Sequence, residues 1–292
     1  MPELPEVQTI VDDLKKKVVG RKITGFWTDT PKIVKTPNLE QKIKACRITG
    51  VARRGKNILI YLSKEKLLLV HQKLTGHLLV GKWKIKKVSL YNFQVISLLD
   101  KYFKEPVNDY IRAIFYLDNG WMIGLSDLRK FAKIMLGEKA EIESSPDLSK
   151  LGPEPLERHF NISVFKDLIK KGKRKIKQVL MDQEIIAGIG NIYSDEILWL
   201  AKVHPFQPAN KLTEKELKTI WQAMRKILKK AVRLRGTSTS DFRDTSGKPG
   251  RYTEIRLAYQ REGKPCLRCK TPLIRKKIGG RSAHYCPKCQ RL

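Results

Sequence analysis

The chain has 292 residues, enough for two domains with separate cores, and 41% of them are apolar, which excludes a wholly disordered protein. No apolar run approaches the roughly eighteen residues of a membrane span, and the acidic start MPELPEVQ argues against a secretory signal. We therefore expect a cytoplasmic protein. Sixty lysines and arginines against twenty-nine acidic residues give a net charge of +31. This excess favours a nucleic acid partner, although the solvated surface lysines of a lysine-rich proteome are an alternative.

Residues 1–135 read mainly as strands and predict an N-terminal antiparallel β-sandwich with a terminal helix. The helix is expected at Glu6–Lys17, where Val7, Ile10, Val11 and Leu14 share one face. Asp118-Asn119-Gly120 has the composition of a hairpin turn. Strands are expected at Ile58–Leu62, Leu67–His71, Val95–Leu99, Ile111–Leu117 and Trp121–Leu125.

The stretch 136–155 is rich in Pro, Ser and acidic residues and is interpreted as a linker. Residues 156–236 read as a helical domain, which makes the predicted fold class α+β. Ser163 is the expected N-cap of a helix over Val164–Lys171, and Thr213 with Glu216 predicts a capping box. Further helices are expected at Lys175–Met181 and Asn191–Lys202, and the helix that starts at Thr213 is expected to end at Gly236.

The C-terminal part divides into a loop region, 237–260, whose polar stretch Thr237–Tyr252 we expect to be mobile, and a zinc finger, 261–292. Cys266, Cys269, Cys286 and Cys289 form a C-x2-C-x16-C-x2-C pattern, whose spacing suits tetrahedral ligation of one structural Zn²⁺. Disulfides are the alternative, and a reducing compartment argues against them. Cys46 stands alone and is interpreted as a small buried hydrophobic residue.

Several motifs, taken together and in this order, resemble the formamidopyrimidine-DNA glycosylase family over the whole chain. They are MPELPEV at the start, RRGKNIL at 53–59, DLRKF at 127–131, LGPEPL at 151–156, DQEIIAGIGNIYSDEILW at 182–199 and GRSAHYCPKCQ at 280–290. The start differs from the Pro-Glu-Gly-Pro-Glu that is typical of the related endonuclease VIII group. The helical domain would then be a helix–two-turns–helix, and 237–260 a lesion-recognition region.

The resemblance places the chemistry at the N-terminus. Removal of Met1 would expose Pro2 as a secondary amine, which attacks the sugar C1′ and forms an iminium. Glu3 is the expected general acid/base, whereas Glu6 is either catalytic or a first-turn acid that favours the helix dipole. Lys56 matches a family lysine that contacts the lesion-side phosphate, with an ordinary turn lysine as the alternative.

An enzyme that acts on a stacked base must extrude it and fill the gap. The family's three inserted side chains map to Leu74, Arg129 and Phe131. The alternative is that Leu74 and Phe131 are ordinary core residues and that Arg129 is a salt-bridge donor. His71, which the resemblance also implies is a DNA-binding residue, begins the segment HQKLTG. The family usually has HLGMSG there, so leucine replaces a methionine wedge.

Two further residues are expected to bind DNA phosphates. Asn191 follows Gly-Ile-Gly at a helix N-terminus, where free N–H groups and the helix dipole favour an anion. Arg281 lies on the zinc hairpin and matches an arginine that reaches phosphates flanking the lesion; a solvated arginine is the alternative. Zinc would position this contact and do no chemistry.

The resemblance implies a monomeric bacterial enzyme, associated with the nucleoid, that binds duplex DNA with oxidised bases or abasic sites. Our first hypothesis is a bifunctional glycosylase and abasic-site lyase that removes oxidised purines and cleaves the strand by β,δ-elimination. The second prefers oxidised pyrimidines, and Ser240, where some relatives carry a basic residue, leaves this open. The third is a catalytically silent zinc-bearing DNA-binding protein. Activity on single-lesion duplexes separates the first two, and borohydride trapping separates both from the third.

Overall fold

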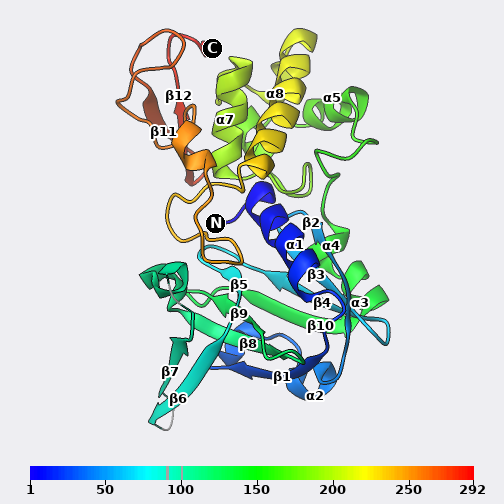
Figure 1. Cartoon of the computed structure of the whole chain (residues 1–292). Helices are drawn as coiled ribbons and strands as arrows, with labels where there is room; N and C mark the ends of the chain where they lie inside the picture. The colour runs from blue at the N-terminus through cyan, green and yellow to red at the C-terminus, as the bar shows by residue number, and fades with distance from the viewer. Residues whose placement is uncertain (90–91, 100) are drawn as a thin grey trace. The chain divides into compact units, whose positions relative to one another are not determined.

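The computed structural model describes residues 1–89, 92–99 and 101–292. The chain forms two compact units, each with its own core (Figure 1). Unit 1 comprises Met1–Ser149 and Arg235–Arg251, and unit 2 comprises Lys150–Leu234 and Tyr252–Leu292. The chain therefore leaves unit 1, builds the helical part of unit 2, returns to unit 1 for one segment, and ends in unit 2.

Unit 1 contains two four-stranded antiparallel sheets, which confirms the predicted sandwich. One sheet has the order β1-β8-β9-β5, formed by Ile23–Thr28, Ile111–Leu117, Met122–Ser126 and His77–Gly81. The other has the order β10-β4-β3-β2, formed by Lys133–Glu138, Lys66–His71, Asn57–Leu62 and Ile48–Arg54. Apolar residues from both sheets join a single buried cluster, so the core lies where the two sheets meet. The predicted hairpin turn joins β8 to β9, and Gly120 there has a φ of +77°, which favours glycine.

The N-terminal helix α1 spans Leu4–Val18 and begins two residues before its predicted start. Pro5 is tolerated in the first turn, because N–H groups there have no partner within the helix. Val7, Ile10, Val11 and Leu14 are fully buried in the same cluster as the sheets, as the helical spacing predicted. Their burial fixes α1 to the sandwich and thereby fixes the place of the chain's N-terminus in unit 1.

Shorter elements complete unit 1. A two-stranded ribbon, β6 (Trp83–Ser89) with β7 (Asn92–Ser97), precedes the short helices η2 (Lys101–Lys104) and η3 (Pro106–Asn108). The other elements are η1 (Pro31–Ile33), α2 (Leu39–Ile43), α3 (Lys139–Ser144) and α4 (Pro146–Ser149). The helices α3 and α4 lie in the stretch interpreted as a linker, and each buries one apolar residue, Ile142 and Leu148. Cys46 is buried, as expected, but it precedes β2 rather than lying in a strand.

Unit 2 is helical with a C-terminal β-hairpin. Its elements are α5 (Ile162–Lys170), α6 (Ile176–Met181), α7 (Asn191–Ala201), η4 (Ala209–Lys211), α8 (Glu214–Arg233), η5 (Tyr252–Ile255), β11 (Ile274–Ile278) and β12 (Arg281–Tyr285). Thr213 and Glu216 form the predicted capping box of α8. The predicted N-cap Ser163 is wrong: Asn161 caps α5, and its side chain accepts a hydrogen bond from the Val164 N–H at 3.1 Å. Asparagine and serine cap equally well, so composition alone did not separate the two.

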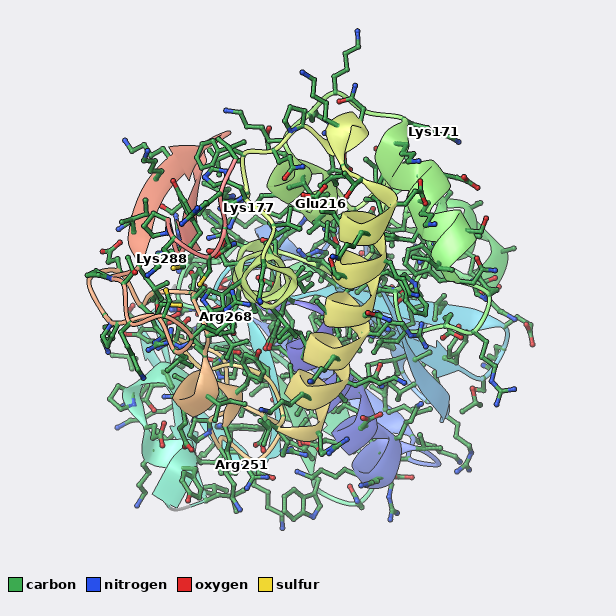
Figure 2. The ribbon with its side chains drawn as sticks, turned by 90° about the horizontal axis from the view of Figure 1, so that it is seen from above. Lys171, Lys177, Glu216, Arg251, Arg268 and Lys288 are labelled. Carbon is green, nitrogen blue, oxygen red and sulfur yellow. The ribbon has the colours of Figure 1, made fainter. Side chains whose placement is uncertain are left out.

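None of the described helices has both the length and the hydrophobicity needed to cross a lipid bilayer. Figure 2 shows nitrogen-tipped side chains on elements throughout the chain, so the positive charge is not confined to one helix.

Candidate active site and nucleic-acid interface

The first group of expected site residues gathers at the start of α1. Pro2, Glu3 and Glu6 are all buried, and Glu6 is held from two sides. Its Oε2 accepts the Glu3 N–H at 2.8 Å, and its Oε1 accepts the Thr237 N–H at 2.7 Å. Gly236 precedes Thr237 with a φ of +78°, and a Cβ on it would lie 2.7 Å from Glu6 Oε1. A glycine is therefore required for the returning segment to approach the Glu6 carboxylate.

Charged groups surround the N-terminal amine. Burial lowers the pKa of the Met1 amine, while the carboxylates of Glu3, Glu6 and Asp241 act in the opposite direction. Lys56 also lowers this pKa, so it lies within electrostatic reach of the amine. A lowered amine pKa increases the neutral, nucleophilic fraction at neutral pH.

Lys56 occupies the turn between β2 and β3 and is 5% exposed. Its neighbour Asn57 is paired with His71 across the β3–β4 ladder, so Lys56 and the end of β4 lie close together. Burial, followed by the charges of Lys73 and Lys56, lowers the pKa of His71 to about 3. His71 is therefore neutral, and its Nδ1 accepts the Lys73 N–H at 2.9 Å.

The three expected wedge residues lie on two neighbouring turns of unit 1. Asp127 connects these turns: Thr75 donates its hydroxyl to one carboxylate oxygen, and the other accepts the N–H groups of Phe131 and Ala132 at 2.7 and 2.8 Å. Thr75 also accepts the Arg129 N–H at 3.1 Å. Leu74, Arg129 and Phe131 are thus carried on turns that a fully buried carboxylate ties together.

Phe131 is 48% exposed, which is unusual for a large aromatic residue and excludes its reading as a core residue. The guanidinium carbon of Arg129 lies 4.9 Å from the centre of the Phe131 ring, so the two side chains stack. The turn therefore presents an aromatic ring and a cation to solvent, and both can contact bases.

Unit 2 carries the two expected phosphate contacts. Asn191 is the first residue of α7, directly after Gly190, and Arg281 is the exposed first residue of β12. A buried network joins these two elements. The Asp195 carboxylate pairs with the Lys177 ammonium and accepts from His284 Nδ1 at 2.8 Å and from the His284 N–H at 3.0 Å. Lys177 (Figure 2) and Asp195 are both fully buried.

The neighbouring carboxylate, Glu196, orders the chain that leads to the zinc hairpin. It accepts the N–H groups of Leu257, Ala258 and Tyr259 at 2.8–2.9 Å, and the Tyr252 hydroxyl at 3.1 Å. Burial raises the pKa of Glu196, and these donors act against that shift. Two adjacent acidic residues of α7 thus connect the helix to the C-terminal hairpin.

The four cysteines of the C-x2-C pairs meet at one point. Their Sγ atoms all lie within 4.8 Å of one another, which fits four thiolates around a single zinc ion at bond lengths of about 2.3 Å. Four sulfur ligands leave no position for substrate, so the site is structural.

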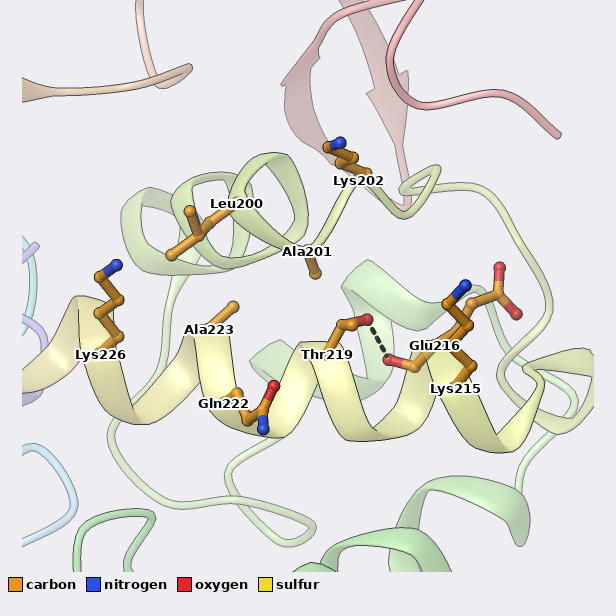
Figure 3. A pocket seen from close by; sticks show the side chains of 9 residues that line it. All are labelled: Leu200, Ala201, Lys202, Lys215, Glu216, Thr219, Gln222, Ala223 and Lys226. Atoms are coloured by element: carbon orange, nitrogen blue, oxygen red, sulfur yellow. Dashed lines mark hydrogen bonds between the residues drawn. The ribbon is translucent and has the colours of Figure 1, made fainter. Parts of the chain in front are cut away.

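A pocket of about 540 Å³ lies between the end of α7 and the neighbouring face of α8 (Figure 3). Lys202, Lys215 and Lys226 line it, together with Glu216 and Thr219. None of the expected site residues lines this pocket, so we do not assign it to the active site.

The comparisons with known proteins cover the same segments. Residues 1–134 match the formamidopyrimidine-DNA glycosylase N-terminal domain, and residues 151–243 match the H2TH domain of the same family. The chain is 37% identical to formamidopyrimidine-DNA glycosylase from Pelotomaculum thermopropionicum over 295 residues, which covers all of both chains. The chain belongs to the formamidopyrimidine-DNA glycosylase family. This is a family of DNA glycosylases of base excision repair.

Further matches agree with this membership. Residues 263–292 match a zinc finger found in FPG and IleRS. The MutM (Fpg) protein of Thermus thermophilus has a TM-score of 0.82 at 32% identity, with 99% of this chain and 98% of that chain covered. Lactococcus lactis Fpg in complex with DNA that contains an abasic site has a TM-score of 0.84 at 29% identity, with coverage of 99% and 100%.

Our sequence reasoning missed the residues that hold this glycosylase's expected site in place. Asp127, Asp195 and Glu196 lie inside the motifs at 127–131 and 182–199, and Lys177 lies five residues before the second one. The signal was present, because acidic residues in otherwise apolar helical segments such as NIYSDEILW must be paired when buried. Thr237 had no comparable signal, since it contributes a backbone N–H.

Proposed function

We propose that this glycosylase removes oxidised purines, such as 8-oxoguanine and formamidopyrimidines, from duplex DNA and then cleaves the strand at the resulting abasic site. The observation that carries the proposal is the cluster at the start of α1: Pro2, Glu3 and Glu6 are buried together, and the amine of the preceding Met1 has a lowered pKa. Such an amine suits nucleophilic attack on a sugar carbon.

Removal of Met1 would expose the secondary amine of Pro2, which is buried next to Glu3. Its lone pair attacks C1′ of the damaged nucleotide, the bond from C1′ to the base breaks, and the base leaves with a proton. Glu3 acts as the general acid/base for the proton transfers at the sugar. The amine loses its proton, the ring opens, and an iminium joins Pro2 to C1′.

The iminium then draws electrons from the sugar. Loss of a proton from C2′ expels the 3′ phosphate in β-elimination, and a second proton loss expels the 5′ phosphate in δ-elimination. Water finally releases the sugar remnant and regenerates the Pro2 amine. Glu6 fixes the N-terminal turn during these steps, because both of its oxygens already accept backbone N–H groups.

The other expected residues act on the DNA. Leu74, Arg129 and Phe131 fill the space that the everted nucleotide leaves, while His71 and Lys56 support the turns near the lesion and Lys56 contacts its phosphate. Asn191 and Arg281 bind phosphates next to the lesion. Two relatives support a purine lesion as substrate. One is named formamidopyrimidine-DNA glycosylase, from Pelotomaculum thermopropionicum, and the other is L. lactis Fpg in complex with DNA that contains Fapy-dG. The protein would act as a monomer on the bacterial chromosome.

A panel of duplexes with one lesion each tests the substrate class. The full chain, with Met1 removed, is incubated with duplexes that carry 8-oxoguanine, a formamidopyrimidine or thymine glycol, and base release is measured under single turnover. The proposal predicts faster release of both purine lesions. Faster release of thymine glycol would contradict the purine assignment and leave the Pro2 chemistry intact.

A further inference from the structure

Two segments of unit 1 that lie far apart in the sequence are joined at two places. We call Tyr102–Asn108 the anchor segment and Ser238–Lys248 the recognition loop. At the first junction, Arg243 Nε donates to Glu105 Oε2 at 2.8 Å. The Arg243 and Glu105 side chains are only 16% and 33% exposed, so solvent screens this pair less than a fully exposed one.

Arg243 also braces the recognition loop from within. Its Nη1 donates to the carbonyl oxygens of Ser240 at 3.1 Å and Phe242 at 2.8 Å. The Phe242 carbonyl accepts the Ser238 hydroxyl as well, at 2.6 Å, and the Phe242 ring is buried in the core of unit 1. The Arg243 guanidinium group therefore holds the loop tip together through two backbone carbonyls and also links it to Glu105.

At the second junction, the backbone of Gly247 approaches the anchor segment closely. A Cβ on Gly247 would lie 3.0 Å from Asn108 Nδ2 and 3.1 Å from the Tyr102 carbonyl oxygen. Asn108 is itself buried and fixed, because it donates to that carbonyl at 2.6 Å and contacts His77 Nε2 at 2.8 Å. His77 begins β5, so the anchor segment is attached to the sandwich.

The ends of the recognition loop are held independently of Glu105. Arg235 pairs with Asp13 at 2.6 Å and with Asp244 at 2.7 Å, and the Val80 N–H donates to the Thr245 carbonyl at 2.8 Å. The Thr237 N–H is bound by Glu6. Loss of the link from Glu105 to Arg243 therefore frees the Arg243 side chain from the anchor segment and loosens residues 239–243, while the contact with Glu6 stays in place.

We propose that Glu105 is a positioning residue that, through Arg243, fixes residues 239–243 in the conformation that receives the everted base. The inference rests on the proposed function, in which this loop meets a damaged base at the Pro2 site. Asp241, within the same five residues, is one of the carboxylates that act on the N-terminal amine, so the loop tip does lie near that site. At a preformed abasic site no base is present, and strand cleavage there does not need the loop tip.

The test compares two reactions of the full-length protein with Met1 removed. Single-turnover rate and half-saturation are measured for 8-oxoguanine release and for cleavage of a preformed abasic site. For base release, Glu105→Gln is expected to lower the ratio of the maximal single-turnover rate to the half-saturating protein concentration about tenfold, since it removes a charge-assisted hydrogen bond. Cleavage at the abasic site is expected to stay within about twofold.

Two controls accompany this variant. Glu143→Gln removes one exposed carboxylate of α3 in the same unit, and it reports any effect of net charge on DNA affinity. The exchanged pair Glu105→Arg with Arg243→Glu restores an ion pair of reversed polarity, and it is expected to recover at least part of base release. Hydrogen exchange of residues 239–243 should rise in Glu105→Gln and fall again in the exchanged pair.

Each outcome bears on the proposal. Unchanged base release in Glu105→Gln, or equal losses in both reactions, would overturn the positioning role. If Glu105→Gln does not fold, the exchanged pair is compared with the single variant Arg243→Glu. If both fold and the exchanged pair does not release the base faster than Arg243→Glu, the positioning role is overturned. Failure of the unmutated protein in both reactions would instead reject the proposed function, so the two failures are distinguishable.

Discussion

The carboxylate of Glu6 accepts a hydrogen bond from the backbone N–H of Thr237, which lies 231 residues further along the chain. This contact joins the first turn of α1 to the segment that returns to unit 1 after the helical unit is complete. The start of α1 is therefore tied to the residue that directly precedes the recognition loop, although the two are far apart in the sequence.

Glu6→Gln is expected to loosen this junction, because an amide has a single acceptor oxygen for two N–H donors. The free energy of unfolding should fall by about 1–3 kcal/mol, as expected for a buried hydrogen bond left unsatisfied. Base release should fall at least tenfold, since the Pro2 turn loses its fixed position. Urea unfolding and single-turnover release of 8-oxoguanine measure the two effects. Glu6→Gln with unchanged stability and rate would contradict the role of this carboxylate.

Asp127→Asn is expected to disorder the turn that carries Arg129 and Phe131. The Asp127 carboxylate is fully buried and has three donors, namely the Thr75 hydroxyl and the N–H groups of Phe131 and Ala132. An amide cannot accept from all three. Base eversion, followed by 2-aminopurine fluorescence, should slow about tenfold or more. Asp118→Asn, in the exposed turn between β8 and β9, is the matched control and should behave as the unmutated protein does.

His71 gives the protein a pH dependence of stability whose sign is fixed. Burial lowers its pKa to about 3 in the folded protein, whereas the unfolded chain has the ordinary value of about 6.5. Between these values the unfolded chain binds more protons, so stability is complete above about pH 6.5 and is lost as the pH falls towards 3. Urea unfolding of the unmutated protein and of His71→Gln at pH 7.5 and 5.5 measures the contribution.

The stability lost between these two pH values should be smaller in His71→Gln than in the unmutated protein. His159→Gln, at an exposed position, is the control and should retain the full loss. An equal loss in all three proteins would contradict a half-buried His71 that stays neutral in the folded protein.

Asp195→Asn is expected to be among the most damaging substitutions in unit 2. It removes the charge that pairs with the fully buried Lys177 ammonium, and breaking such a pair costs about 3–5 kcal/mol. It also weakens the contact with His284 that joins α7 to β12, so affinity for DNA should fall together with stability. Urea unfolding and DNA titration measure the two losses. The exposed acid Glu214, changed to Gln, is the control and should leave both quantities nearly unchanged.

Much of the fold followed from local patterns in the sequence. The apolar face of α1, the turn at Gly120 and the capping box at Thr213 each depend on residues a few positions apart, and all three were predicted. The start of α1 and the N-cap of α5 were each missed by two residues, because neighbouring residues compete for a cap and helix ends are the least sharply encoded part of a helix.

The site was less accessible from the sequence, for two physical reasons. Its expected chemical residues stand in recognisable motifs, but the groups that hold them act through contacts between distant segments. Thr237 binds Glu6 through its backbone, and Glu105 meets Arg243 across 138 residues, so neither leaves a local pattern. The polar composition of Thr237–Tyr252 predicted a mobile loop, and it gave no sign of the hydrogen bonds that its side chains form within unit 1.

The proposed chemistry is tested most directly by borohydride reduction during the reaction with 8-oxoguanine duplex. Protein with Met1 removed should form a covalent complex with DNA, and peptide mass spectrometry should place the reduced bond on the Pro2 nitrogen. Pro2→Gly should form no such complex. A duplex that is cleaved by protein with a free Pro2, while no adduct forms or the adduct lies on a lysine, would contradict the account.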